Sequence, residues 1–79
     1  VQFHYNTVAQ AGGNGFTATS ADASDVHNNV FYASTGYGIS GDATSTGLTI
    51  GNNSFYSNSV GAYSISGTDS GGHLTSNPD

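Results

Sequence analysis

The sequence predicts an all-β solenoid of about three coils and the start of a fourth, and three observations support this prediction. Similar segments recur about every two dozen residues along the 79-residue chain. Within these segments apolar residues stand two apart, which is the period of a β-strand with one buried face. Between them lie Gly, Asn, Ser and Asp, which favour turns. Such a repeat buries its inner face only by stacking on its neighbours, so equivalent strands pair in parallel.

The clearest repeat matches residues 27–32 with residues 51–56 at an offset of 24. The third strand of each coil is matched at other offsets, with residues 15–19 on 36–40 and residues 36–41 on 62–67. Insertions between matched segments are expected in turns. The alignment predicts one domain, residues 1–79, with coils at about 1–24, 25–47, 48–72 and 73–79.

Four columns of equivalent positions follow from this alignment. They are Phe3, Val26, Ile50 and Leu74; Asn6, Asn29, Asn53 and Asn77; Val8, Phe31 and Phe55; and Phe16 with Ala18, Tyr37 with Ile39 and Tyr63 with Ile65. An inward asparagine at a turn can satisfy backbone groups and pass its amide to the asparagine of the next coil. We therefore expect the four asparagines to form a structural ladder. Aromatic stacking one coil apart is expected for Phe31 on Phe55 and for Tyr37 on Tyr63.

The repeat is similar to the right-handed parallel β-helix repeats of pectate lyases, polygalacturonases and phage tailspikes. The shared pattern is an apolar residue, two or three residues, Asn, one residue, an aromatic residue, a turn, and then Gly-aromatic-x-aliphatic, and it covers nearly all of the chain. The resemblance implies three strands per coil, right-handed winding and an asparagine stack at one turn. It does not indicate a function, because this architecture carries many activities.

The charge balance excludes several partners. The chain has five Asp, no Lys or Arg, no Cys, and a formal net charge of −5. Nucleic acids and anionic lipid surfaces attract proteins through Lys and Arg, so neither is an expected partner. No stretch approaches the roughly 20 apolar residues that span a bilayer, so membrane insertion is not expected. A surface of Ser, Thr, Asn and Gly favours an extracellular or cell-surface location.

No catalytic residue, cofactor or metal site is predicted. The lyases and hydrolases that share the repeat use grouped acids with basic helpers, and no position here carries a matching motif. His4 and His27 are expected one coil apart, but His73 aligns with Thr49, so the three histidines do not converge as a zinc site requires. The aspartates are expected in turns, where they accept backbone hydrogen bonds; these are Asp22, Asp25, Asp42 and Asp69.

Two outward features suggest binding. Tyr32 and Tyr56 follow inward phenylalanines, so they point outward one above the other, where they either stack on sugar rings or simply cover the sheet. Asn52 begins the only N-glycosylation sequon, which matters only in a glycosylating host. We expect a structural extracellular protein, a subunit or segment of a fibre, appendage or adhesin stalk that stacks end to end. The alternative is a carbohydrate-binding module or a non-catalytic fragment of a polysaccharide-active β-helix protein.

Overall fold

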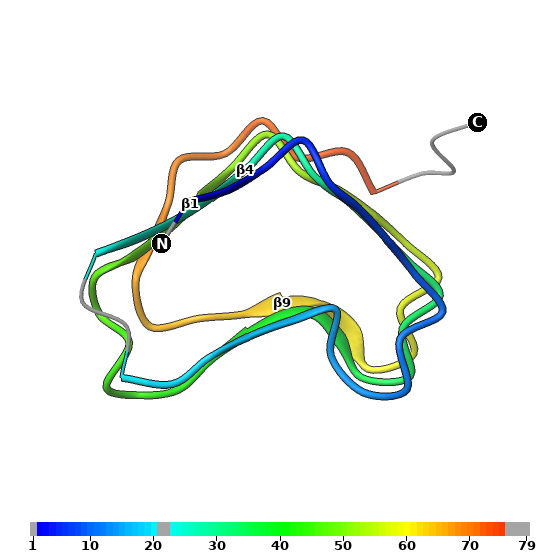
Figure 1. Ribbon diagram of the computed structural model, residues 1–79, viewed down its shortest axis with the longest axis horizontal. Helices are drawn as coiled ribbons and strands as arrows, with labels where there is room; N and C mark the ends of the chain where they lie inside the picture. Colours follow the sequence, from blue (N-terminus) through cyan, green and yellow to red (C-terminus); the bar gives the residue numbers. More distant parts are fainter. Residues whose placement is uncertain (1, 21–22, 76–79) are drawn as a thin grey trace.

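The backbone winds in successive turns that lie over one another around one axis (Figure 1). The computed structural model of the chain describes residues 2–20 and 23–75. Each full coil contributes three short strands. They are β1 (Gln2–His4), β2 (Thr7–Ala9), β3 (Phe16–Ala18), β4 (Ser24–His27), β5 (Val30–Tyr32), β6 (Tyr37–Gly41), β7 (Leu48–Gly51), β8 (Ser54–Tyr56), β9 (Gly61–Ser64) and β10 (Thr68–Asp69).

The strands form three sheets, each built from equivalent strands of successive coils. Sheet A has the order β1-β4-β7-β10, sheet B the order β2-β5-β8 and sheet C the order β3-β6-β9. Every pairing between these strands is parallel. The predicted all-β fold, a parallel β-helix of about three coils, is therefore confirmed.

Two turn positions in each coil adopt the left-handed backbone conformation. One precedes the asparagine column and the other follows the sheet B strand; the first set is Tyr5, Asn28 and Asn52 and the second is Gln10, Ala33 and Ser57, with φ between 51° and 60°. Left-handed backbone is costly for most side chains, so its recurrence marks points where the path of the coil is fixed. Because both turns repeat at 23 and then 24 residues, coils one and two have nearly equal length.

The core is a set of apolar columns inside the coils. Fully buried members are Val26, Phe31, Ile39, Leu48 and Ile50. The rings of Phe31 and Phe55 stack with centroids 5.6 Å apart and planes 12° apart, which confirms the stacking expected for this pair.

The predicted register of sheet C is wrong by two residues. Ile39 pairs with Phe16 on one side and with Tyr63 on the other, so the offsets are 23 and 24. Tyr37 therefore lies over Gly61, and the expected stack of Tyr37 on Tyr63 does not form.

Two glycines explain this register. A Cβ at Gly15 would lie 2.6 Å from the ring of Phe31, and one at Gly38 would lie 2.6 Å from the ring of Phe55. The inward phenylalanines of sheet B thus need a glycine opposite them in each of these coils. Gly15 and Gly38 are 23 residues apart, the same spacing as the other columns.

The fourth coil begins earlier than predicted. Asp69 pairs with Ile50, so Leu74 does not follow Ile50 in sheet A, and the fourth coil starts at Thr68 instead of near residue 73. Leu74 forms a bridge to Ser54 and is 61% exposed. Only residues 65–67 separate β9 from β10, and the last of them, Gly67, passes so close to the Leu48 carbonyl that a Cβ would collide with it.

Asparagine side chains link the coils at the turn between sheets A and B. Asn6 Nδ2 donates to Asn29 Oδ1 at 3.3 Å, and Asn29 Nδ2 donates to Asn53 Oδ1 at 3.1 Å. The backbone N–H groups of Asn6 and Asn29 donate to the same two oxygens. One coil further on, His73 occupies the equivalent place and its Nδ1 accepts from the Asn53 N–H at 3.0 Å. Asn77 lies outside the described residues.

We predict that Asn53→Leu destabilises the chain by about 1–3 kcal/mol, because it leaves the Asn29 N–H and the Val26 carbonyl without their side-chain partner. The free energy of unfolding in urea measures the effect. Asn28→Asp is the matched control, since Asn28 is exposed and Asp tolerates its left-handed backbone. Equal stability of Asn53→Leu and the wild type would contradict a buried ladder.

Candidate functional site

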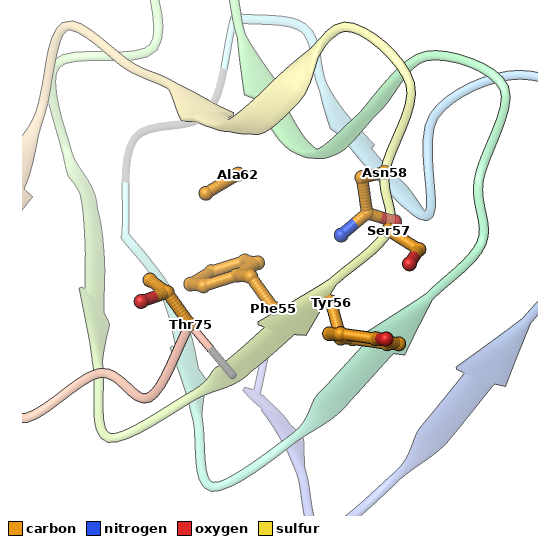
Figure 2. Close-up of a pocket in the computed structure, with 6 residues that line it drawn as sticks. All are labelled: Phe55, Tyr56, Ser57, Asn58, Ala62 and Thr75. Carbon is orange, nitrogen blue, oxygen red and sulfur yellow. The ribbon is translucent and has the colours of Figure 1, made fainter. Parts of the chain in front are cut away.

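Sheet B carries a pair of stacked tyrosines on its outer face. Tyr32 and Tyr56 are in register in β5 and β8, with ring centroids 5.5 Å apart and planes 2° apart. Tyr32 is 38% exposed. In Figure 2, Tyr56 and Phe55 leave strand β8 on opposite sides, with Phe55 on the side of the coil interior. The structure thus brings together the two tyrosines that the sequence singled out.

The third coil is hollowed at the end that faces the fourth coil. An open pocket of about 210 Å³ lies there, lined by Phe55, Tyr56, Ser57, Asn58, Ala62 and Thr75. Figure 2 shows the side chains of Phe55 and Ala62 directed into the coil interior, with Thr75 from the fourth coil beside them. The pocket is therefore partly apolar and is covered only in part by the fourth coil.

A cluster of two histidines and one aspartate lies on the outer face of sheet A. His4 and His27 are paired in register, as expected from their 23-residue spacing. Asp25 lies in strand β4, so its predicted position in a turn is wrong. Because Asp25 and His27 are two residues apart in one strand, their side chains leave the same face of the sheet. His4 Nε2 lies 3.1 Å from Asp25 Oδ2, and His27 Nδ1 contacts Asp25 Oδ1, which makes an ion pair when the imidazole is protonated.

The outward column that contains the histidines changes in later coils. Gly51 pairs with His27, and the next position is Ser70, whose Oγ lies 3.4 Å from His27 Nε2. A Cβ at Gly51 would collide with both His27 and Ser70, so the glycine makes room for their contact. The sequence did contain a signal for this cluster, since Asp25 and His27 share the parity of an outward column. The cluster was not predicted, because Asp25 was assigned to a turn.

A second group of polar side chains forms at the fourth coil. The Tyr63 hydroxyl donates to Asp69 Oδ2, and His73 Nε2 lies 2.7 Å from Asp69 Oδ1. The hydrogen bond from Tyr63, with those from the Gly71 N–H and His73, holds the pKa of Asp69 below its usual value of 3.8. The same bond raises the pKa of Tyr63.

The predicted positions of His73 and Asp69 were wrong, because the alignment took the third coil as about 24 residues long, whereas Asp69 pairs with Ile50, only 19 residues before it. His73 lies over Asn53 instead of beside Thr49, and its ring packs against Phe55 and Tyr63. Asp69 lies in strand β10.

Asp42 does begin a turn, as predicted. Its carboxylate accepts hydrogen bonds from Ser45 and Thr44, which lower its pKa. Asn52 is exposed at the left-handed turn between β7 and β8. Asp22 lies outside the described residues. Within residues 2–20 and 23–75, the structure contains no helix that is both long enough and apolar enough to cross a membrane.

Three stacked parallel sheets with equivalent side chains in columns define the chain as a parallel β-helix protein. A model of the family described as periplasmic copper-binding protein (NosD) matches residues 2–77, and the chain belongs to this family. The family is one of parallel β-helix proteins, which agrees with the predicted resemblance at that level. Its description places it in the cell envelope. Comparison with curated proteins and with solved structures gave no match.

We predict a loss of stability in acid that depends on Asp69. Its pKa is lowered in the folded chain, so its contribution is present above its unfolded value of 3.8 and is lost as the pH falls below that value toward the folded pKa. Urea midpoints compared at about pH 6 and about pH 3 measure this loss. Asp69→Asn and Tyr63→Phe should both lose less stability than the wild type over this interval. An unchanged pH dependence in both variants would contradict the assignment.

Proposed function

We propose that the chain is a non-catalytic structural segment of a cell-envelope or extracellular protein, whose function is to form and extend a stack of β-coils. The observation that carries this proposal is the partly apolar hollow at the end of the third coil, into which Phe55 and Ala62 point and which the fourth coil covers only in part. Buried apolar surface stabilises by roughly 25 cal/mol per Å². A further coil placed over this hollow gains that stabilisation, as each coil already does from its neighbours.

The opposite end of the stack supports the same proposal. Strands β1, β2 and β3 each pair on one side only within the described residues. The inward residues of this coil, Phe3, Val8 and Phe16, are only partly buried although they pack against the core. Unpaired parallel edges and incompletely covered apolar columns are features that solenoids cover with another coil or a cap.

End-to-end contact between copies would pair one end of a stack with the opposite end of the next. The two faces differ, so the contact is heterologous and repeats without closing, which gives a fibre or stalk. The absence of Lys and Arg supports a structural function, because the chain then lacks the basic groups that accompany acidic residues in the catalytic sites of lyases and hydrolases with this repeat.

The edge of the first coil provides a test by proline substitution. The Asn6 carbonyl accepts from Val30 in the second coil, so the next N–H in the chain, that of Thr7, points away from that coil. Thr7→Pro removes a donor from the free edge with little expected cost to the fold, because Thr7 is exposed and begins its strand.

We predict that the wild-type chain forms species larger than a monomer, with an axial spacing near 4.8 Å in fibre diffraction, and that Thr7→Pro shifts the population to monomer. Light scattering after size-exclusion chromatography and electron microscopy measure this. Ala43→Pro is the control, because Ala43 follows Asp42 in a turn closed by Ser45, where proline is well accepted. Equal assembly of Thr7→Pro and the wild type would exclude pairing through this edge.

A second candidate function is favoured by the tyrosine pair. The two tyrosine rings, with planes 2° apart and centroids 5.5 Å apart, form a parallel stack on the outer face of sheet B. Sugar rings of a polysaccharide bind through their apolar faces to such aromatic surfaces. The stack of tyrosines along the coil axis would align an extended glycan with the solenoid.

We predict that, if this second function holds, Tyr56→Ala lowers polysaccharide affinity at least about tenfold, which corresponds to about 1.4 kcal/mol. Affinity electrophoresis in gels that contain soluble pectin, xylan or alginate measures the change. Tyr5→Ala is the matched control, since Tyr5 is 82% exposed and lies outside the stack. If the wild type migrates without retardation in every gel, polysaccharide binding is contradicted and only the structural function remains.

A further inference from the structure

The asparagine ladder ends in a group that can be protonated. In the second and third coils the ladder residue accepts the backbone N–H of the preceding coil on an amide oxygen, as Asn53 Oδ1 does from the Asn29 N–H. In the fourth coil His73 takes this place, and its Nδ1 accepts from the Asn53 N–H at 3.0 Å. An amide oxygen accepts at any pH near neutrality, whereas an imidazole Nδ1 accepts only while it carries no proton. The last contact of the ladder therefore depends on pH.

The surroundings of His73 fix the position of the proton on its neutral ring. Its Nε2 lies 2.7 Å from Asp69 Oδ1, and because a carboxylate only accepts, Nε2 carries the proton and Nδ1 the lone pair. The His73 side chain is 8% exposed, and its ring packs against Phe55 and Tyr63. Water therefore has little access to the Asn53 N–H if the imidazole stops accepting from it.

The charges around His73 stay constant while its ring titrates. Within residues 2–20 and 23–75, strand β10 presents Asp69 to the ring, β9 presents Tyr63, and β8 presents Phe55, which has no titratable group. The hydrogen bond from Tyr63 holds the pKa of Asp69 below 3.8, and the same bond raises the pKa of Tyr63 above 10.0. Histidine is the side chain that ordinarily titrates between about pH 5 and 8. In that interval only the charge of His73 changes at this place.

Protonation of His73 breaks a contact between the third and fourth coils. It puts a second donor opposite the Asn53 N–H, and a buried N–H without an acceptor is unfavourable. The ion pair gained with Asp69 does not replace this contact, because His73 and Asp69 both belong to the fourth coil and stand four residues apart. The bonds that remain at this turn are those from the Leu74 N–H to the Asn53 carbonyl and from the Phe55 N–H to the Leu74 carbonyl.

We propose that His73 is a pH-sensitive latch that holds residues 73–75 over the end of the third coil. The neutral ring closes the latch, and the protonated ring opens it and uncovers the hollow that Phe55, Ala62 and Thr75 line. This inference rests on the proposed function, because that hollow is the place where a further coil is added. In mild acid the end of the stack is therefore more open to a further coil than at neutral pH.

Amide hydrogen exchange followed by nuclear magnetic resonance tests the latch. The protection factor of an amide is its exchange rate in a free peptide divided by its rate in the folded chain. That of the Asn53 N–H is expected to fall at least about tenfold from about pH 7.5 to about pH 5.5. The Asn29 N–H is the internal control, because its acceptor, Asn53 Oδ1, does not titrate in this interval. The proposal is overturned if the ratio of the two protection factors is the same at both pH values.

A variant and a second measurement identify the group that titrates. His73→Asn gives the fourth coil the ladder residue of the other coils, so protection of the Asn53 N–H should no longer depend on pH. His4→Asn is the matched control and should behave as the wild type does, because His4 lies in the first coil. Circular dichroism checks that both variants keep their β-structure. In the wild type, the ring-nitrogen chemical shifts of His73 should change with the same pH midpoint as the protection of Asn53, and different midpoints would contradict the latch.

The same experiment separates the latch from the proposed function. Exchange and ring-nitrogen shifts report on single groups of the chain and do not require assembly. Light scattering at both pH values measures assembly independently, and it is expected to show larger species at about pH 5.5 for the wild type but not for His73→Asn. A wild type that stays monomeric at both pH values contradicts the proposed function, whereas the exchange of the Asn53 N–H decides the latch.

Discussion

The stacking register of the coils is the constraint on which the other features of the structure depend, and Asn29 shows how it is held. Asn29 Nδ2 donates to Asn53 Oδ1 in the next coil and to the Phe3 carbonyl in the previous one. Asn29 Oδ1 accepts from Asn6 Nδ2. One buried side chain therefore ties three coils at the same turn. A slip of the register by one residue would leave these amide groups unpaired in the interior, at a cost of about 1–3 kcal/mol for each group.

Stacking in register also explains the composition. Each column places equivalent residues about 4.8 Å apart, so a column of one charge would repel itself along the whole stack. Neutral columns gain from the same proximity, as the rings of Phe31 with Phe55 and of Tyr32 with Tyr56 show. A chain of this architecture can dispense with Lys and Arg, because backbone hydrogen bonds, asparagine side chains and stacked rings provide its contacts between coils.

The sequence predicted sheets A and B through the third coil but not sheet C or the fourth coil, for physical reasons. The alignment matched aromatic residues, whereas the register of sheet C follows the glycines that make room for inward rings, Gly15 and Gly38. In the fourth coil His73 replaces asparagine at the ladder position. The alignment assumed a fourth asparagine there and therefore assigned this position to Asn77. The sequence does show that Asp25 and His27 stand two residues apart and so face the same side of a strand. Their contact with His4 could be predicted only if Asp25 was assigned to the strand instead of to a turn.

Inward columns must keep a similar size and polarity from coil to coil, but outward columns are free to change, so the outer surface of such a stack can differ from one coil to the next. The column that begins with His4 and His27 continues as Gly51 and Ser70, and this change is what leaves space for His27 to turn toward Ser70. The tyrosine pair lies on a different sheet and shares no residue with this cluster. A stack of coils can therefore add one outer site without disturbing another, since the interior that holds the register is the same beneath both.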